Sequence, residues 1–521
     1  MQSSFHVIDW VIIAAYLLAM AGVGVYFSRR QNSLDHFILA DRSMAWLPVG
    51  LSLMAALNSG MDYLMQPSAT IKYGAVLTAG VFSWFAVYPW VAKVAFPFYH
   101  RLNFYTAYEY LEARFDVRVR TLGALIFVIW RLGWMATAMY VPSLAINAAS
   151  GGQVDLNTVT IIVGTVVTLY TMLGGIQAVI WNDVIQFCIM FGGLVATVAI
   201  VLVSVPGGLF EILAVAGAAG KLDIWPPLVD PAAVTVIDQI ASFFTQPLTL
   251  ISVMASLVFG RMATYTSDQV MVQRLQTTRS IKDAKQAFVV NAVGDALWMV
   301  GLSFVGLALF AYFQNRALPP EFQTDKLVPY FMSLAFPAGA VGLVIAAIMA
   351  ASISSIDSAI NSCSSVAVVD LYNRLWLGKD LERGAQSAQG ERRQVMASRV
   401  ATVFFGGLGT VLACNVSRIG SLLEIANKLV NAFSGPLFGI FLLAMFSPRS
   451  RSGGVLAAGV AGAFVSYYVA YESTIGFMWP STFGLAATLA VGGALAAIRP
   501  ASGDAPGRQL TWRAVMARPV A

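Results

Sequence analysis

Charged residues are scarce in this chain, and their scarcity argues against most classes of soluble protein. Only 11% of the 521 residues are Asp, Glu, Lys or Arg, against roughly 25% in an ordinary soluble domain. Hydrophobic residues make up 58% and the mean hydropathy is +0.72. A secreted enzyme, a nucleic-acid-binding protein and a disordered scaffold all fit poorly, whereas the 44 glycines fit a helical membrane protein.

Cysteine and histidine are also few. The three cysteines, Cys188, Cys363 and Cys414, lie in separate apolar stretches without a CxxC pair, which argues against a disulfide framework or a zinc site. The three histidines lack metal-ligand spacing, and no HExxH motif or Ser–His dyad lies at membrane depth. We therefore expect no enzyme, no nucleic-acid ligand and no obligatory protein partner.

Long apolar stretches follow one another along almost the whole chain. About 20 apolar residues can cross a bilayer as a helix, so we expect an all-α polytopic membrane protein. The first stretch has no basic segment before it, which favours a retained span over a cleaved signal peptide. The sequence predicts thirteen spans, at residues 7–27, 45–71, 75–97, 121–148, 158–174, 179–205, 239–265, 286–313, 338–369, 398–416, 420–446, 454–472 and 475–498.

The distribution of basic residues predicts the orientation of these spans. With the N-terminus outside, 23 of the 32 Lys and Arg residues fall in cytoplasmic segments and five in external segments. Cytoplasmic loops of membrane proteins carry such an excess of positive charge. We therefore expect an external N-terminus, a cytoplasmic C-terminus and a location in the plasma membrane.

Two blocks of five spans, 45–205 and 239–446, begin on opposite sides of the membrane under this topology. The first span of each block contains helix-breaking sequence, from Asn58 to Ser68 and from Gly260 to Thr266. Interrupted helices at matching positions of inverted repeats indicate a transporter with a site near the midplane; ordinary kinks filled by packing are the alternative. The remaining segments are predicted as an extra span and loop at 1–44, an extracellular loop at 206–238, two additional spans at 447–498 and a basic cytoplasmic tail at 499–521.

The ninth predicted span carries the densest polar sequence. On a helix Ser354, Asp357, Ser358 and Asn361 share one face by their three- and four-residue spacing. Lipid does not tolerate such a face, so it should point into the bundle. Oxygen ligands of this kind suit a hard cation such as Na⁺, and a hydrogen-bonded seam between helices is the alternative.

Several charged residues lie within predicted spans, where charge is expensive and functional by default. Asp183 is either an interfacial helix cap or a cation ligand. Arg131, between Trp130 and Trp134, suits a carboxylate ligand, or it forms an internal ion pair with Asp62 or Glu109. Arg261 likewise either binds a carboxylate ligand or forms an internal ion pair.

Several motifs resemble those of the sodium/solute symporter family over roughly residues 7–446. The run Tyr-Thr-Met-Leu-Gly-Gly-Ile-Gln-Ala at 170–178, followed by Trp-Asn-Asp-Val-Ile-Gln at 181–186, is similar to the family signature. The segments 268–274 and 431–439 resemble two later family motifs. The resemblance implies a bacterial-type member with a LeuT-type inverted five-helix repeat and Na⁺-coupled solute symport.

The resemblance also implies site residues. For a principal Na⁺ site it implies the carbonyls of Ala55, Asn58 and Ala351 and the hydroxyls of Ser354 and Ser355. For a further cation site it implies Asp183, Asp357 and Ser358. The carboxyl group of Asp357 leaves two alternatives for the ion at this site, Na⁺ and a proton. Substrate-binding candidates are Asp62, Ser83, Arg131, Arg261 and Asn431, and gate candidates are Trp84, Tyr265 and Phe433.

The substrate expected from these residues is a small carboxylate-bearing anion. Asp62 and Arg261 are charged where sugar-transporting relatives carry polar side chains, which disfavours a hexose. The run from Arg131 to Ala145 resembles a sialic-acid-transporting branch, and Gln66 to Gly74 resembles iodide, vitamin and monocarboxylate carriers. The alternatives are a neutral solute, with Arg131 and Arg261 held in internal pairs, or a transporter-like solute sensor.

Overall fold

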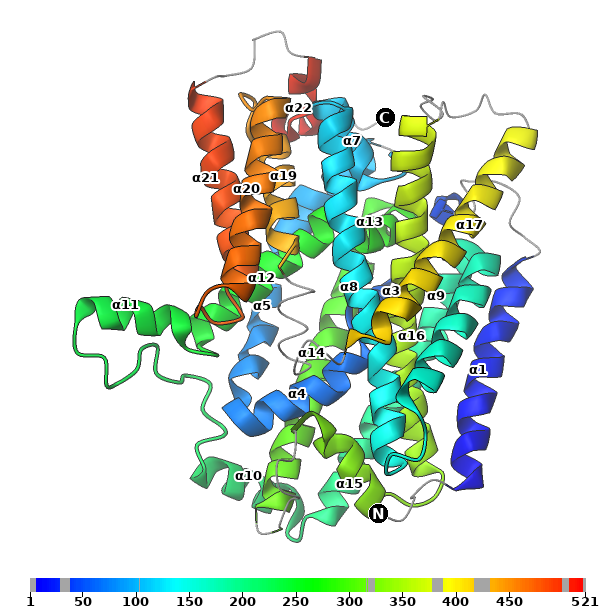
Figure 1. The fold of residues 1–521 in the computed structure, drawn as a ribbon, viewed down its shortest axis with the longest axis vertical. Helices are drawn as coiled ribbons and strands as arrows, with labels where there is room; N and C mark the ends of the chain where they lie inside the picture. Colours follow the sequence, from blue (N-terminus) through cyan, green and yellow to red (C-terminus); the bar gives the residue numbers. More distant parts are fainter. Residues whose placement is uncertain are drawn as a thin grey trace.

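A computed structural model shows a bundle of long helices (Figure 1). The structure describes residues 6–28, 38–102, 104–314, 316, 324–376, 388–416, 432–498 and 506–518. Regular structure within these ranges is helical, as expected for a backbone that must satisfy its own polar groups in lipid.

The first block begins with a helix broken in two and ends with a kinked helix. Gly175, with φ 60° and ψ −169°, interrupts α9 and separates the predicted spans 158–174 and 179–205. The elements of this block are α3 (Trp46–Leu57), α4 (Gly60–Tyr73), η2 (Ala75–Phe82), α5 (Ser83–Trp90), η3 (Val91–Ala95), α6 (Phe96–Leu102), α7 (Ala107–Arg114), α8 (Val117–Ala149) and α9 (Leu156–Ser204).

The second block also begins with a broken helix, but the break lies at Asp268 and not within 260–266. Asp268 has extended backbone (φ −91°, ψ 114°), while Gly260 to Thr266 continue α12. The elements are α12 (Leu250–Ser267), α13 (Gln269–Gln276), α14 (Ile281–Phe313), η4 (Thr324–Lys326), α15 (Leu327–Ala335), α16 (Ala340–Val366), η5 (Ala367–Trp376), α17 (Ala388–Ala413) and α19 (Ser434–Phe446).

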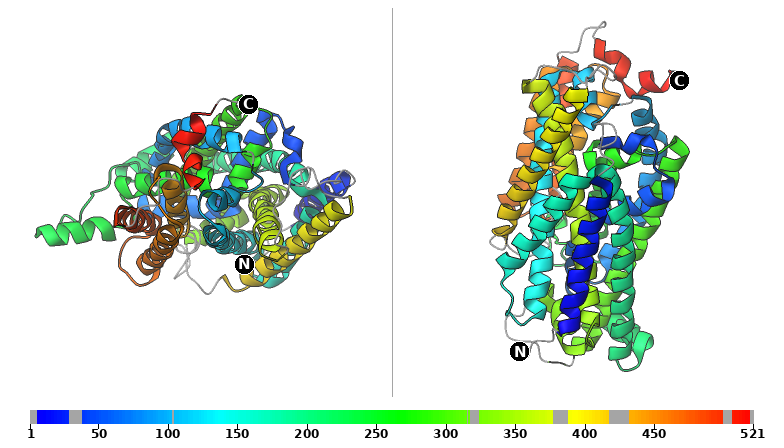
Figure 2. Two further views of the ribbon diagram at one scale, coloured as in Figure 1. Left: turned by 90° about the horizontal axis from the view of Figure 1, so that it is seen from above. Right: turned by 90° about the vertical axis from the view of Figure 1, so that its right-hand side faces the viewer.

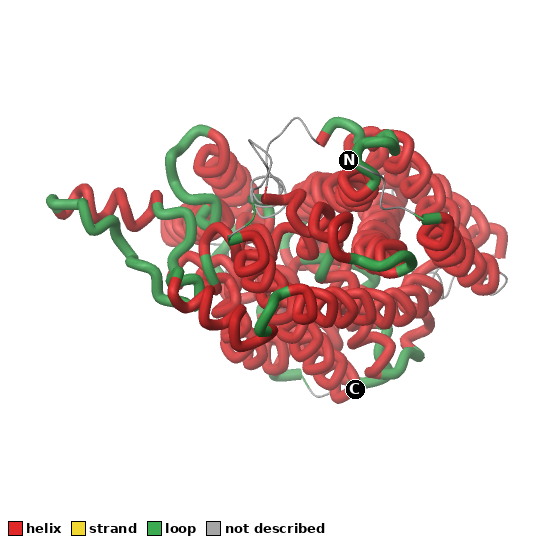
Figure 3. The backbone as a smooth tube through the Cα atoms, turned by 90° about the horizontal axis from the view of Figure 1, so that it is seen from below, coloured by secondary structure: helices red, strands yellow, loops and turns green. Residues whose placement is uncertain are grey.

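Short helices also occur where the sequence predicted a loop or a straight span. The expected loop 206–238 contains α10 (Gly208–Ala218), and α11 (Val236–Thr245) is bent by 51° from α12. Figures 1, 2 and 3 show α11 extending away from the body of the molecule. The other elements are α1 (Val7–Ser28), η1 (Ala40–Arg42), α20 (Ser452–Tyr471), α21 (Pro480–Ile498), η8 (Pro506–Leu510) and α22 (Trp512–Met516).

Eight helices within the described residues are long and apolar enough to cross a membrane, or nine if α11 and α12 count as one span. Shorter apolar helices cover several of the other predicted spans, including α3 and the first half of α9. The predicted segment 420–446 lies partly outside the described residues. The chain is therefore an all-helical polytopic membrane protein, while the count of thirteen and the orientation stay predictions.

The helix α16 is buried along most of its length and packs against α8, α9 and α1 (Figure 1). Small residues allow this close packing: a Cβ on Gly193 of α9 would lie 2.2 Å from the Cβ of Ala347. At the start of α16, Asp9 of α1 accepts hydrogen bonds from the amides of Gly339 and Gly342 at 2.9 and 2.7 Å. The polar face of α16 is thereby held in the interior, as its sequence predicts.

The C-terminal segment is docked against the body. The indole of Trp512 donates a hydrogen bond to the carbonyl of Val94 at 3.2 Å and packs 6.0 Å from the ring of Phe446. Val515 is fully buried. The described part of the predicted tail is thus an amphipathic segment packed on α6 and α19.

Candidate functional site

The break between α3 and α4 exposes backbone oxygens in the interior. Asn58 and Ser59 have extended backbone, so α3 ends at Leu57 and α4 begins at Gly60. The last carbonyls of a helix have no intrahelical partner, and they carry the negative end of its dipole. The break therefore places a partial negative charge beside α16.

Two hydroxyls of α16 meet these carbonyls. The Oγ of Ser354 lies 2.8 Å from the carbonyl oxygen of Ala55 and 2.9 Å from that of Ala351. The Oγ of Ser355 lies 3.1 Å from the carbonyl oxygen of Asn58. All five residues are buried, so the structure brings the expected principal-site oxygens together in one dry cluster.

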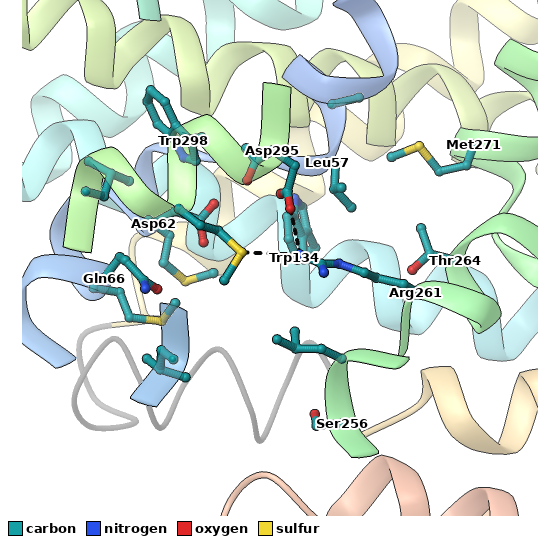
Figure 4. Close-up of a pocket in the computed structure, with 18 of the residues that line it drawn as sticks. Leu57, Asp62, Gln66, Trp134, Ser256, Arg261, Thr264, Met271, Asp295 and Trp298 are labelled. Carbon is teal, nitrogen blue, oxygen red and sulfur yellow. Dashed lines mark hydrogen bonds and ion pairs between the residues drawn. The ribbon is translucent and has the colours of Figure 1, made fainter. Parts of the chain in front are cut away.

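A cavity of about 210 Å³ lies next to this cluster and is shown in Figure 4. Asp62 and Gln66 of α4 stand on one side of it, and Ser256, Arg261 and Thr264 of α12 stand on the other. The cavity is thus formed by both broken helices, with walls from α8 and α14. Its charged lining residues are Asp62, Arg131, Arg261 and Asp295.

Arg261 is held by an internal ion pair. Its Nη2 lies 2.6 Å from Oδ2 of Asp295, and its Nη1 donates to the carbonyl of Gly80 at 2.8 Å and contacts the hydroxyl of Ser83. The guanidinium also lies over the ring of Trp84, 4.1 Å from the centroid. Ser83 is buried behind Arg261 and is absent from the cavity lining.

Arg131 is paired as well, but with neither of the expected partners. Its guanidinium contacts the carboxylate of Asp268 and lies near the rings of Trp130 and Trp134, 4.7 and 5.4 Å from their centroids. Asp268 is fully buried and also caps α13 through the amide of Val270 at 3.0 Å. The expected pairing with Asp62 or Glu109 was wrong.

The two rejected partners have other contacts. Glu109 belongs to the capping box of α7 with Thr106. Asp62 belongs to the capping box of α4: its Oδ2 accepts the amide of Ser59 at 2.6 Å. Unlike Glu109, Asp62 faces the cavity (Figure 4).

The residues expected for a further cation site surround a guanidinium. Arg274 Nη2 lies 3.0 Å from Oδ2 of Asp183 and contacts the hydroxyl of Ser358. Asp357 accepts a hydrogen bond from Tyr170 at 2.6 Å, and its Oδ1 lies 3.2 Å from the hydroxyl of Ser358. Arg274 is fully buried.

The gate candidates lie in one apolar cluster. Trp84 packs edge-on against Phe288, with ring centroids 5.4 Å apart, and Tyr265 packs against the same ring at 4.9 Å. Tyr265 lines a second, smaller cavity together with Tyr99 and His100. Phe433 is half-buried just before α19, and Asn431 lies outside the described residues.

The sequence analysis did not identify three residues that form ion pairs with the site candidates. They are Asp268, Asp295 and Arg274. Each is a charged residue that the structure buries, and charge within a span is a signal of function. Asp295 lies within the predicted span 286–313 and could have been found in this way. Asp268 and Arg274 lie at the break and in α13, outside the predicted spans, so the same signal did not apply to them.

Known proteins resemble this chain along most of its length. The family model described as "Sodium:solute symporter family" matches residues 37–462. A sodium/sialic acid symporter of Aliivibrio fischeri is 30% identical over 94% of this chain and 93% of its own, and the human sodium-coupled monocarboxylate transporter 1 is 31% identical over 91% and 74%.

Solved structures agree with these sequence matches. The substrate-bound, outward-open state of a Na⁺-coupled sialic acid symporter superposes with a TM-score of 0.83 at 28% identity, covering 96% of this chain and 99% of that one. A nucleobase-cation-symport-1 family transporter superposes with a TM-score of 0.50 at 14% identity, covering 92% and 99%. The fold is therefore of the LeuT type, as the motif resemblance implied.

Proposed function

The chain belongs to the sodium:solute symporter family, which contains multi-pass plasma-membrane transporters and not enzymes, and we propose that it imports a small carboxylate-bearing solute together with Na⁺. Na⁺-coupled symport of a solute follows from the family itself. The direction of transport, the ion ligands and the class of solute are the content of the proposal.

In this proposal the principal Na⁺ ion is bound by three carbonyl and two hydroxyl oxygens, those of Ala55, Asn58, Ala351, Ser354 and Ser355. The observation that carries it is the convergence of both hydroxyls on the carbonyls at the end of α3, at 2.8 to 3.1 Å. A hard cation prefers oxygen ligands, and the negative end of the α3 dipole adds to its attraction.

Sodium would connect α3 to α16 and so couple ion binding to the cavity. Asn58 contributes a carbonyl to the proposed ion site and also lines the cavity. An ion that fixes the α3–α4 break therefore also fixes the cavity wall. Na⁺ shifts the population of conformers only as far as it binds one conformer more tightly than another. The energy for uptake comes from the ion: each positive charge that moves inward across a membrane potential of 100 mV contributes about 2.3 kcal/mol.

The carboxylate of the solute would bind at Arg131. This arginine lines the cavity, and the planar guanidinium fork matches a carboxylate. The relatives named for sialic acid and for monocarboxylates support an acidic solute. The cavity volume of about 210 Å³ lies below the roughly 300–1,000 Å³ of sites for drug-sized ligands, which favours a small metabolite.

One observation favours the alternative of a neutral solute. Both cavity arginines have internal carboxylate partners, Asp268 for Arg131 and Asp295 for Arg261. For an acidic solute, Arg131 must exchange the carboxylate of Asp268 for that of the solute. For a neutral solute the ion pair between Arg131 and Asp268 remains intact and only stabilises the fold.

The second cation site stays a weaker proposal. Asp357 and Ser358 are close enough to bind one ion together, but the negative charge of Asp183 is neutralised by Arg274. We therefore place a second Na⁺ or a proton at Asp357. Its substitution by Asn should reduce the Hill coefficient of Na⁺ activation if a second ion is transported.

Uptake into proteoliposomes under an inward Na⁺ gradient tests the main proposal. We expect a small carboxylate to be taken up in Na⁺ but not in choline, and Arg131→Lys to weaken it at least about tenfold through loss of the bidentate contact. Uptake of an uncharged solute with equal efficiency in Arg131→Lys would select the neutral alternative. A normal melting transition of the variant would exclude misfolding as the cause.

A further inference from the structure

Asp62 is a charged residue of the cavity for which the described part of the chain provides no cationic partner. Its contacts are with Ser59, whose amide lies 2.6 Å and whose hydroxyl lies 3.5 Å from Oδ2. Among the described residues no Lys, Arg or His lies within ion-pair distance of it. Because Arg131 and Arg261 are neutralised by Asp268 and Asp295, the described residues of the cavity and its ion pairs carry one net negative charge, and this charge is on Asp62.

This uncompensated carboxylate is costly in a low-dielectric site. The positive end of the α4 dipole offsets part of the charge, but a buried charge normally requires a counter-ion. The side chain is partly exposed to the cavity, and Figure 4 shows it on the wall opposite Arg261. A cationic group on a molecule in the cavity would supply this counter-ion.

A second observation concerns hydrogen-bond donors of the cavity residues. The indole Nε1 atoms of Trp130, Trp134 and Trp298 are buried and have no hydrogen-bond partner among the described residues, and all three residues line the cavity. Trp130 and Trp134 flank the guanidinium of Arg131. The walls thus combine indole donors around Arg131 with a lone carboxylate on α4.

We propose that the transported solute is zwitterionic, with a carboxylate directed to Arg131 and its flanking indoles and a protonated amine directed to Asp62. This inference rests on the proposed function, because it takes the same cavity and the same carboxylate end. An ammonium group supplies a cationic partner for Asp62, and a solute carboxylate supplies hydrogen-bond acceptors near Arg131 and its flanking indoles. Because a zwitterion has no net charge, it adds no further charge to the cavity. A plain monocarboxylate would leave Asp62 unpaired and add a second negative charge.

Matched pairs of solutes test this inference on the purified full-length protein. Propanoate is compared with 2-aminopropanoate and 3-aminopropanoate, and butanoate with 4-aminobutanoate, each in NaCl and in choline chloride. Thermal stabilisation and competition for Na⁺-dependent uptake report binding. We expect the amino compounds to bind about 10- to 100-fold more tightly than their parents, the range of a charge-assisted hydrogen bond.

The variant Asp62→Asn should abolish this preference and leave the Na⁺ dependence in place. Asn retains an oxygen that can accept the amide of Ser59, so the cap of α4 survives. Asp155→Asn is the matched control, because Asp155 caps the start of α9 on the surface. That variant should keep the preference for amino compounds.

Three results would overturn the inference, and they separate it from the proposed function. A Na⁺-dependent response to the parent acids that equals or exceeds the response to the amino compounds refutes the zwitterion and leaves carboxylate symport standing. A loss of Na⁺ affinity in Asp62→Asn with the amino preference intact assigns the carboxylate to ion binding instead. The absence of a Na⁺-dependent response to both series refutes the inference together with the proposed function.

Discussion

Removal of the Ser354 hydroxyl gives the most direct test of the proposed Na⁺ site. Ser354→Ala deletes one of five oxygen ligands and leaves the carbonyls of Ala55 and Ala351 without their hydroxyl partner. A hydrogen bond or ligand contact to a charged group contributes about 1.5–3 kcal/mol. The dissociation constant for Na⁺ should therefore rise by about 10- to 150-fold.

The assay is a Na⁺ titration of thermal stability in detergent, accompanied by Na⁺-dependent uptake in proteoliposomes. At Na⁺ concentrations above both dissociation constants, each tenfold loss of affinity removes about 1.4 kcal/mol of sodium-dependent stabilisation. Ser364→Ala is the matched control: this hydroxyl lies on the same helix, is buried, and donates to the carbonyl of Ser398 at 2.7 Å.

Both variants should lose some intrinsic stability, since each leaves a buried carbonyl without its partner. Only Ser354→Ala should lose sodium affinity. Equal Na⁺ titrations for Ser354→Ala and the wild type, or an equal loss in Ser364→Ala, would refute the placement of the ion between α3 and α16.

Further predictions concern the charges and the C-terminal segment. Arg274→Ala leaves Asp183 buried without its cation and should cost about 3–5 kcal/mol of stability, whereas the double variant with Asp183→Asn should recover most of it in thermal unfolding. Burial raises the pKa of Glu112, but hydrogen bonds from Arg374 and Arg120 outweigh it and hold that pKa below its ordinary value. Glu112→Gln should therefore destabilise at neutral pH, and the difference from wild type should vanish in unfolding curves as pH falls below the lowered pKa. Trp512→Ala removes a half-buried contact with η3 and α19 and should cost about 1–3 kcal/mol. The control Trp376→Ala, at a side chain that is 83% exposed, should change the melting temperature little; equal shifts in both variants would show that the C-terminal segment is not docked.

The sequence alone determined the class of the protein and the helix faces that form the site. Scarce charge and repeated apolar stretches require membrane-spanning helices, and the serine spacing on α16 requires one polar face, which the structure buries. The oxygens at 55, 58, 351, 354 and 355 were named from the resemblance to the sodium/solute symporter family, because spacing along one helix does not identify the carbonyls of another helix that lie beside it.

Only the tertiary structure decided which charges neutralise one another. Arg131 pairs with Asp268, 137 residues away, and Arg274 pairs with Asp183, 91 residues away. Periodicity specifies the direction of a side chain on its own helix, but not which residue of another helix lies opposite. For this reason Asp62 and Glu109 were equally plausible partners for Arg131, and the lone negative charge of Asp62 emerged only when the helices were packed together.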